Sequence, residues 1–143
     1  MGTLTTYLEA GSPGLPVARV PMLNQRVLDF SVTNVTATDI LQLFQCPEDY
    51  IVLEAGYEIL TAGTASGTLD FGQAGGTELL SAIALDAAAG TKAAGSLANP
   101  LFLNDSDTLD VQINTSTMIL GKIRIWWIGI DVSEMNTEND LVA

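Results

Sequence analysis

Few side chains in this 143-residue sequence could carry out catalysis or hold a metal ion. The chain has no histidine and a single cysteine, Cys46. Histidine is the commonest general base and metal ligand, and one thiol can form neither an internal disulfide nor a cysteine cluster. Histidine-based triads and zinc sites built from cysteine and histidine are therefore excluded. Cys46, beside Pro47, is predicted to be a small buried apolar residue and not a nucleophile.

Two short motifs resemble ligand-binding loops but lack their defining residues. Residues 104–107 with Asp110 offer oxygen ligands, yet the glycine and distal glutamate of an EF-hand are missing. Residues 72–76 are glycine-rich but have neither the Lys-Ser/Thr of a phosphate loop nor GxGxxG spacing. Both are typical of turns. Glycoside hydrolysis uses a pair of carboxyl groups, and any two of the 17 acids could lie close enough in the fold, but nothing in the sequence singles out one pair. We therefore predict no enzyme, no cofactor and no metal site.

The charge balance limits the partners. The 17 acidic and five basic residues give a net charge of −12, and the bases are scattered along the chain. Nucleic acids and anionic membranes both require clustered Lys and Arg, so neither is expected as a partner. The most apolar run, residues 123–130, is far shorter than the roughly 20 residues of a membrane span. Residues 1–4 do not begin a signal peptide, which predicts synthesis and assembly in a cytoplasm.

The low content of charge indicates a subunit of an assembly. Only 15% of the residues are charged, against about 25% in an average domain. The surface must then consist largely of Thr, Ser, Asn, Gln, Gly and Ala. Such a surface is easily buried against a neighbour, because few charges lose their hydration.

Alternation of apolar and polar residues along the chain predicts its secondary structure. In residues 27–35, Leu28, Phe30 and Val32 alternate with polar residues, as in a half-buried strand. Similar segments recur about every ten residues with Gly-rich turns between them, which is typical of sandwiches and barrels. The other predicted strands are residues 40–45, 50–53, 57–61, 68–72, 100–103, 108–114 and 118–132.

The predicted fold is all-β, a single jelly-roll-like β-sandwich of about eight strands over residues 27–132. An extended Pro/Gly-rich arm, residues 1–26, precedes it, and an acidic tail, residues 133–143, follows it. One short helix is predicted at about residues 77–85, with Thr77 as its N-cap, lying across one end of the sandwich. Residues 90–99 are predicted to be a Gly/Ala/Ser loop.

The last predicted strand is apolar on both faces in its second half. One face carries Ile123, Ile125, Trp127 and Gly129, and the other carries Lys122, Arg124, Trp126, Ile128 and Ile130. A half-buried strand should keep one polar face, so something must cover Trp126, Ile128 and Ile130. The cover is either the arm at residues 15–23 or the helix of the same subunit, or else another subunit.

The arm is a second candidate contact. Leu15, Val17, Arg19 and Arg26 belong to an apolar, proline-punctuated segment that lies extended either on its own domain or on a neighbour. Arg19 and Arg26 are two of the five bases, which makes the arm a candidate contact to an acidic shell or subunit.

Four segments resemble small β-sandwich proteins encoded in the structural modules of tailed phages. They are residues 57–63, 68–72, 78–82 and 121–125, within a resemblance that covers residues 50–132. In those proteins a strand ending in xLxhG precedes a short hLxA helix, and the last strand opens with xGKhxh, where x is any residue and h an apolar one. Relatives of this kind include capsid decoration (cement) proteins that sit as trimers on the shell, head fibres and tail components, and they offer no catalytic residues.

The resemblance implies a decoration protein on the outer surface of the capsid of a virion. It would form a homo-oligomer, a trimer, and bind the major capsid protein across joints between capsomers, opposing the pressure of packaged DNA. The alternatives are a tail, fibre or head-completion protein of the same fold, and a carbohydrate-binding sandwich with exposed aromatic residues.

Overall fold

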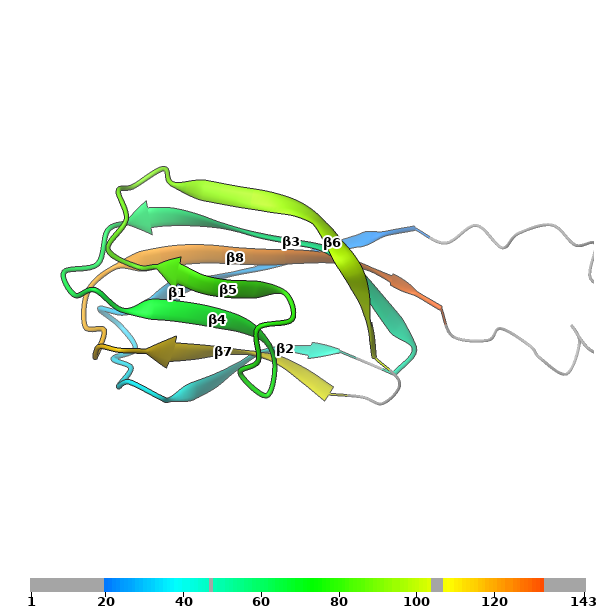
Figure 1. The fold of residues 1–143 in the computed structure, drawn as a ribbon, viewed down its shortest axis with the longest axis horizontal. Coiled ribbons are helices and arrows are strands. Elements are labelled where there is room, and N and C mark those ends of the chain that lie inside the picture. The colour runs from blue at the N-terminus through cyan, green and yellow to red at the C-terminus, as the bar shows by residue number, and fades with distance from the viewer. Residues whose placement is uncertain (1–19, 47, 104–106, 133–143) are drawn as a thin grey trace, which may run out of the picture.

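The structure, a computed structural model, describes residues 20–46, 48–103 and 107–132, and every regular element in these ranges is a β-strand. The strands form two four-stranded sheets packed face to face (Figure 1). One sheet has the order β1-β8-β3-β6 and the other the order β2-β7-β4-β5. The strands are β1 (Met22–Asp29), β2 (Ile40–Cys46), β3 (Tyr50–Thr61), β4 (Thr68–Gln73), β5 (Leu80–Ala84), β6 (Lys92–Leu103), β7 (Asp107–Asn114) and β8 (Lys122–Asp131).

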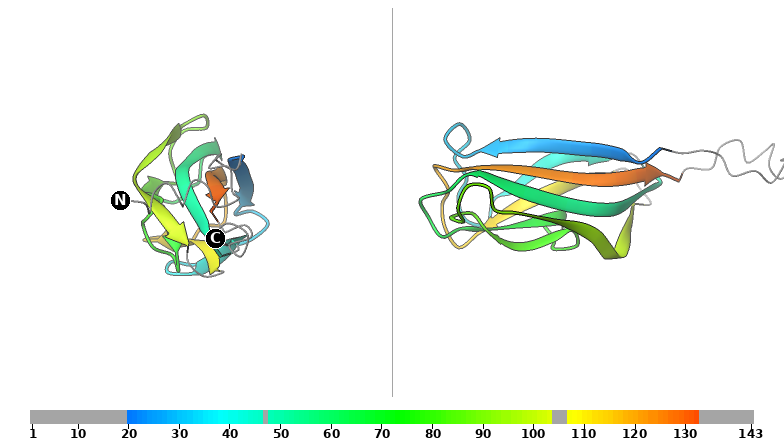
Figure 2. Two further views of the ribbon diagram at one scale, coloured as in Figure 1. Left: turned by 90° about the vertical axis from the view of Figure 1, so that its right-hand side faces the viewer. Right: turned by 90° about the horizontal axis from the view of Figure 1, so that it is seen from above.

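The topology is that of a jelly roll. Each strand of the first half of the chain pairs antiparallel with one of the second half: β1 with β8, β2 with β7, β3 with β6 and β4 with β5. The chain is thus one long hairpin, folded so that its strand pairs alternate between the two sheets (Figure 2). Eight strands in two sheets with this connectivity define a jelly roll. The predicted eight-stranded sandwich is therefore confirmed.

The core lies between the inner faces of the two sheets. Leu69 and Phe71 of β4, Val111 of β7, and Ile123 and Ile125 of β8 are fully buried. The Phe44 ring lies 5.9 Å from Phe71 of its own sheet and 6.1 Å from Trp127 of the other, and the second contact joins the sheets. Burial of these alternating side chains is the main force that holds the sheets together.

The helix predicted at residues 77–85 is wrong, because this segment contains β5. Leu79, Ile83 and Leu85 are buried and Ala82 is exposed. The backbone N–H of Ala82, which has a positive φ of 52°, donates to Oδ1 of Asp70 at 2.8 Å. The apolar spacing 79, 80, 83 suits a helix as well as an irregular strand. A helix this short has little stability of its own, so pairing with β4 decides its conformation.

Three other boundaries differ from the sequence pattern. Residues 90–99, predicted as a loop, supply most of β6, which pairs with β3. The two strands predicted at residues 50–53 and 57–61 form one strand, β3, with a bulge between Val52 and Glu54. β1 begins at Met22, inside the range assigned to the arm, and ends at Asp29. Val32, predicted to face the core, is 81% exposed in the following turn.

One end of the sandwich is closed by loop residues. Val35 and Met118 form an isolated β-bridge between two loops, and both are buried. Phe30 is also buried, and its backbone N–H donates to the carbonyl of Gly121 at 2.9 Å. Gly121 has a φ of +117°, and β8 begins at the next residue, Lys122. The Gly-Lys step thus opens the last strand.

Trp127 links both sheets, which leads to a test of the fold. It is 2% exposed and contacts the rings of Phe44 and Tyr50 edge-on. We expect Trp127→Ala to lower the free energy of unfolding by about 3–5 kcal/mol, because it removes this packing and leaves a cavity. Urea unfolding measures the loss. Val32→Ala is the control and should change stability by less than about 0.5 kcal/mol; equal effects of the two substitutions would contradict the assignment.

Candidate assembly surface

β8 is the second strand of its sheet, and its two faces differ as the sequence predicted. Burial alternates along it, with Ile123, Ile125, Trp127 and Gly129 buried and the residues between them half-buried. The half-buried residues Trp126, Ile128 and Ile130 lie on the outer face of the β1-β8-β3-β6 sheet. The separation of the two faces is confirmed. The role of these three residues in an interface stays a prediction.

The first half of the outer face is ion-paired. Lys122 of β8 contacts Asp29 of β1 at 3.1 Å, and Arg124 of β8 contacts Glu58 of β3 at 2.8 Å. Hydrogen bonds from Ser31 and then from Lys122 lower the pKa of Asp29 below its usual value. Each pair joins residues directly opposite one another on neighbouring strands. Exposed pairs of this kind add little stability, but they leave this half of the face hydrated.

The second half of the outer face is largely apolar, with one acid, Glu54 of β3, opposite Ile128. Ile128 lies opposite Leu23 of β1, and Ile130 lies opposite Ile51 of β3. Ile51 in turn lies opposite Phe102 of β6. We call this the apolar patch: Leu23, Ile51, Phe102, Trp126, Ile128 and Ile130. Leu23 is 59% exposed and Phe102 47%.

Trp126 lies flat on the sheet because its neighbour on β3 is a glycine. A Cβ atom added at Gly56 would overlap the indole ring of Trp126. Leu23, Trp126 and Ile128 line a shallow depression of about 360 Å³ with Gln25, Glu58 and Arg124. The depression therefore lies on the border between the apolar and the ion-paired halves.

No cover for the apolar patch lies within the described residues. One proposed cover, the helix, does not exist, since residues 80–84 form β5 in the opposite sheet. The other, the arm, places Leu15, Val17 and Arg19 outside the described residues. Only its last part is seen, where β1 lies beside β8 and contributes Leu23 to the patch itself.

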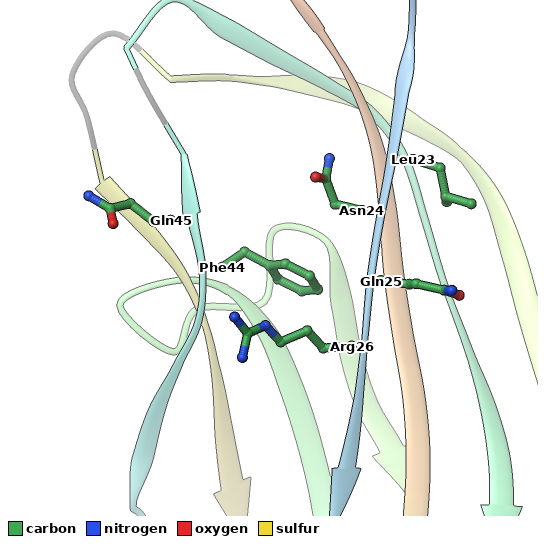
Figure 3. A pocket seen from close by; sticks show the side chains of 6 residues that line it. All are labelled: Leu23, Asn24, Gln25, Arg26, Phe44 and Gln45. Carbon is green, nitrogen blue, oxygen red and sulfur yellow. The ribbon is translucent and has the colours of Figure 1, made fainter.

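Arg26 lies apart from the patch, on the inner side of β1. Figure 3 shows Arg26 and Phe44 reaching into the gap between the edges of β1 and β2, with Leu23 and Gln25 pointing to the other side of β1. Asn24, Arg26, Phe44 and Gln45 line this cleft of about 550 Å³ together with Leu23 and Gln25. The structure thus does not bring Arg26 together with Trp126, Ile128 and Ile130 on one face.

The other residues considered for chemistry have structural surroundings. Cys46 is fully buried, as predicted. Asp107 and Asp110 are three residues apart on β7, so they point to opposite faces of the strand. Residues 104–106 lie outside the described residues. Gly75, with a φ of +74°, belongs to the turn between β4 and β5, in which the N–H of Gly76 bonds to the carbonyl of Gln73.

The side chains and elements of the described ranges bear on metal binding and on membranes. No three His, Cys, Asp or Glu side chains in them come together as possible metal ligands. They also contain no helix long and apolar enough to cross a membrane.

Leu23, Ile51 and Phe102 were missed by the sequence analysis. Each belongs to a different strand, so only the register of the sheet shows that they adjoin Ile128 and Ile130. One signal was present: Ile51 lies one residue before the buried Val52, and alternation places it on the outer face.

Comparison with solved structures shows where this fold occurs. Three similar chains come from the structures titled "Acidic stable capsid structure of Helicobacter pylori bacteriophage KHP30", "Cyanophage Pam1 capsid asymmetric unit" and "Capsid of Ralstonia phage GP4". Their TM-scores are 0.58, 0.60 and 0.57, and their identities are 15%, 18% and 19%. The matches cover 82%, 84% and 87% of this chain and 92%, 91% and 96% of those chains.

The similarity is one of fold. The chain shares its eight-stranded sandwich with chains of three phage capsids over most of its length, as the resemblance implied. No family model matches the sequence, and no curated protein matches it.

The burial of Cys46 predicts a protected thiol. Burial first, and then the nearby charge of Asp107, raise its pKa from 9.0 to about 11. We expect the folded protein at pH 8 to react with a thiol reagent such as DTNB only as fast as it unfolds, and one equivalent to react at once in guanidinium. Rapid stoichiometric labelling of the folded protein would contradict the burial.

The same shift predicts a pH dependence. The folded thiol holds its proton at a pH where the unfolded thiol has lost it, so its contribution to stability is present below pH 9 and is lost between pH 9.0 and about 11. Cys46→Ala should therefore lose less stability than the wild type over this range, as measured by urea unfolding. An identical alkaline decline in both proteins would contradict this.

Gly56 predicts a test of the position of Trp126. We expect Gly56→Ala to lift the indole ring from the sheet and to cost about 1–3 kcal/mol, because the added methyl takes the ring's place. Acrylamide quenching of tryptophan fluorescence should rise. Gly95→Ala on β6 is the matched control, since a Cβ there meets no atom within 4 Å. Equal quenching in the two variants would show that Trp126 does not lie on Gly56.

Proposed function

We propose that this protein is a structural component of a phage head, a decoration (cement) protein on the outer surface of the capsid. It binds the major capsid protein across joints between capsomers and holds the shell against the pressure of packaged DNA. It acts as a homo-oligomer, a trimer, assembled in the host cytoplasm. Its role is mechanical and requires no catalytic residues.

The observation that carries this proposal is the jelly roll shared with chains of three phage capsids. Two features of the described residues support it. The sandwich presents a face that is half apolar, which is typical of a subunit that is buried in an assembly. The low content of charge, 15%, makes burial of further surface inexpensive.

The net charge of −12 supports the outer position. A protein that packed directly against the genome would need Lys and Arg to neutralise phosphates, and this chain has five such residues. On the outside of a particle the same charge keeps particles apart in solution.

A carbohydrate-binding sandwich is favoured less. Such a module would present several aromatic rings on one face or loop. Tyr50 packs edge-on against the buried Trp127, and Tyr57 lies opposite the buried Ile125 on the inner side of the sheet. Tyr7 lies outside the described residues. On the outer face, Trp126 of β8 and Phe102 of β6 lie two strands apart, so they do not form a continuous aromatic surface.

Binding to heads tests the proposed function. Full-length protein would be added to DNA-filled heads of the encoding phage that lack it, and binding would be measured by co-sedimentation. We expect saturable binding at a fixed ratio to the major capsid protein, and heads that release DNA at a higher temperature when decorated. Immunogold labelling should mark the outer surface of the head. Absence of binding to heads, or labelling confined to the tail, would overturn the proposal.

A further inference from the structure

We propose that the apolar patch is occupied by the same patch on further copies of this chain, so that β1, β3, β6 and β8 of each copy face a common rotation axis. The inference deepens the proposed function and rests on it for its setting in a virion. It names the partner of one face, which is a second copy of the chain and not the shell.

The first argument is the composition of the patch. Ile51, Trp126 and Ile128 are only half-buried, although each has an apolar side chain that water solvates poorly. Tryptophan is the residue type most enriched among those that dominate binding energy. Trp126 is held flat against Gly56, so the ring loses little conformational freedom when a partner covers it. The patch is therefore pre-organised for a contact.

The second argument is the distribution of charge. The outer face of this sheet carries three acids and three bases: Asp29, Glu54, Glu58, Lys92, Lys122 and Arg124. The described residues hold 12 acids and four bases, so nine acids and one base, Arg26, lie elsewhere in them. Two copies that approach through the rest of the described surface bring acidic surfaces together, which opposes association. Within the described surface, the outer face of this sheet has balanced charge, so two identical chains meet there without net repulsion.

The third argument is that the two ion pairs lie beside the patch, which contains a single acid, Glu54 of β3, opposite Ile128. Lys122–Asp29 and Arg124–Glu58 are already neutralised within one chain. A copy that covers the patch therefore leaves these charges at the rim, where they stay hydrated, and a polar rim around an apolar centre is the usual anatomy of an interface. Glu54 must keep water or a cation of the other copy beside it in this contact, because burial of an unpaired charge is costly.

Light scattering of the full-length protein, without any capsid, tests the inference. We expect size-exclusion chromatography with light scattering to show a closed oligomer at micromolar concentration. Trp126→Asp and Ile128→Asp should each weaken association by about tenfold or more, because a buried unpaired carboxylate opposes contact. Dilution of the wild type through the dissociation range should raise acrylamide quenching of Trp126, since the ring becomes exposed.

Val32→Asp is the matched control. It introduces the same charge at a residue that is 81% exposed and lies in the turn after β1. We expect it to keep the wild-type oligomer. Circular dichroism and thermal melts of every variant separate dissociation from unfolding, and Phe102→Ser supplies a milder change at an exposed patch residue should the aspartates unfold the chain.

Two outcomes would overturn the inference. One is a monomer at high concentration in the wild type. The other is an oligomer that Trp126→Asp, Ile128→Asp and Phe102→Ser leave unchanged while all three remain folded. Binding to heads is measured separately, so a monomer that still decorates heads would refute the inference and keep the proposed function. An oligomer that fails to bind heads would refute the proposed function and keep the inference.

Discussion

The placement of β8 between β1 and β3 is the constraint on which the rest of the structure depends. It pairs with both neighbours over nearly its whole length, in a register that joins the two ends of the described chain. Its inner residues form the centre of the core, and its outer residues supply the cations of the two ion pairs and half of the apolar patch. Because side chains alternate across a strand, a shift of this register by one residue would exchange the core and the outer face.

Two adjacent tryptophans show how one strand serves both purposes. Trp127 points inward, lies over Gly129 of its own strand and contacts Phe44 of the other sheet. Trp126 points outward and lies over Gly56 of β3. Each ring occupies the space above a glycine, which restores packing where the sheet lacks a side chain. The inner ring stabilises the fold, and the outer ring offers a rigid apolar surface to a partner.

The fold was predicted from the sequence better than its individual elements were. The count of eight strands was right, but two predicted strands merged into β3, and β5 arose where a helix was expected. The merger depends on a bulge near Leu53 that keeps the ladder continuous, and β5 depends on Asp70, which accepts a hydrogen bond from the N–H of Ala82. Both are contacts between segments distant in sequence, so local periodicity could not show them.

The residues along the chain were enough to predict a β-sandwich without histidine chemistry, and a last strand whose second half is apolar on both faces. Alternation and composition are local properties, and they can be read along one strand. The folded chain was needed to show that the patch also includes Leu23, Ile51 and Phe102, and that Arg26 lies in a separate cleft. It was also needed to show that no helix of the described residues covers Trp126. These facts follow from register and strand order, which depend on pairing across the whole chain.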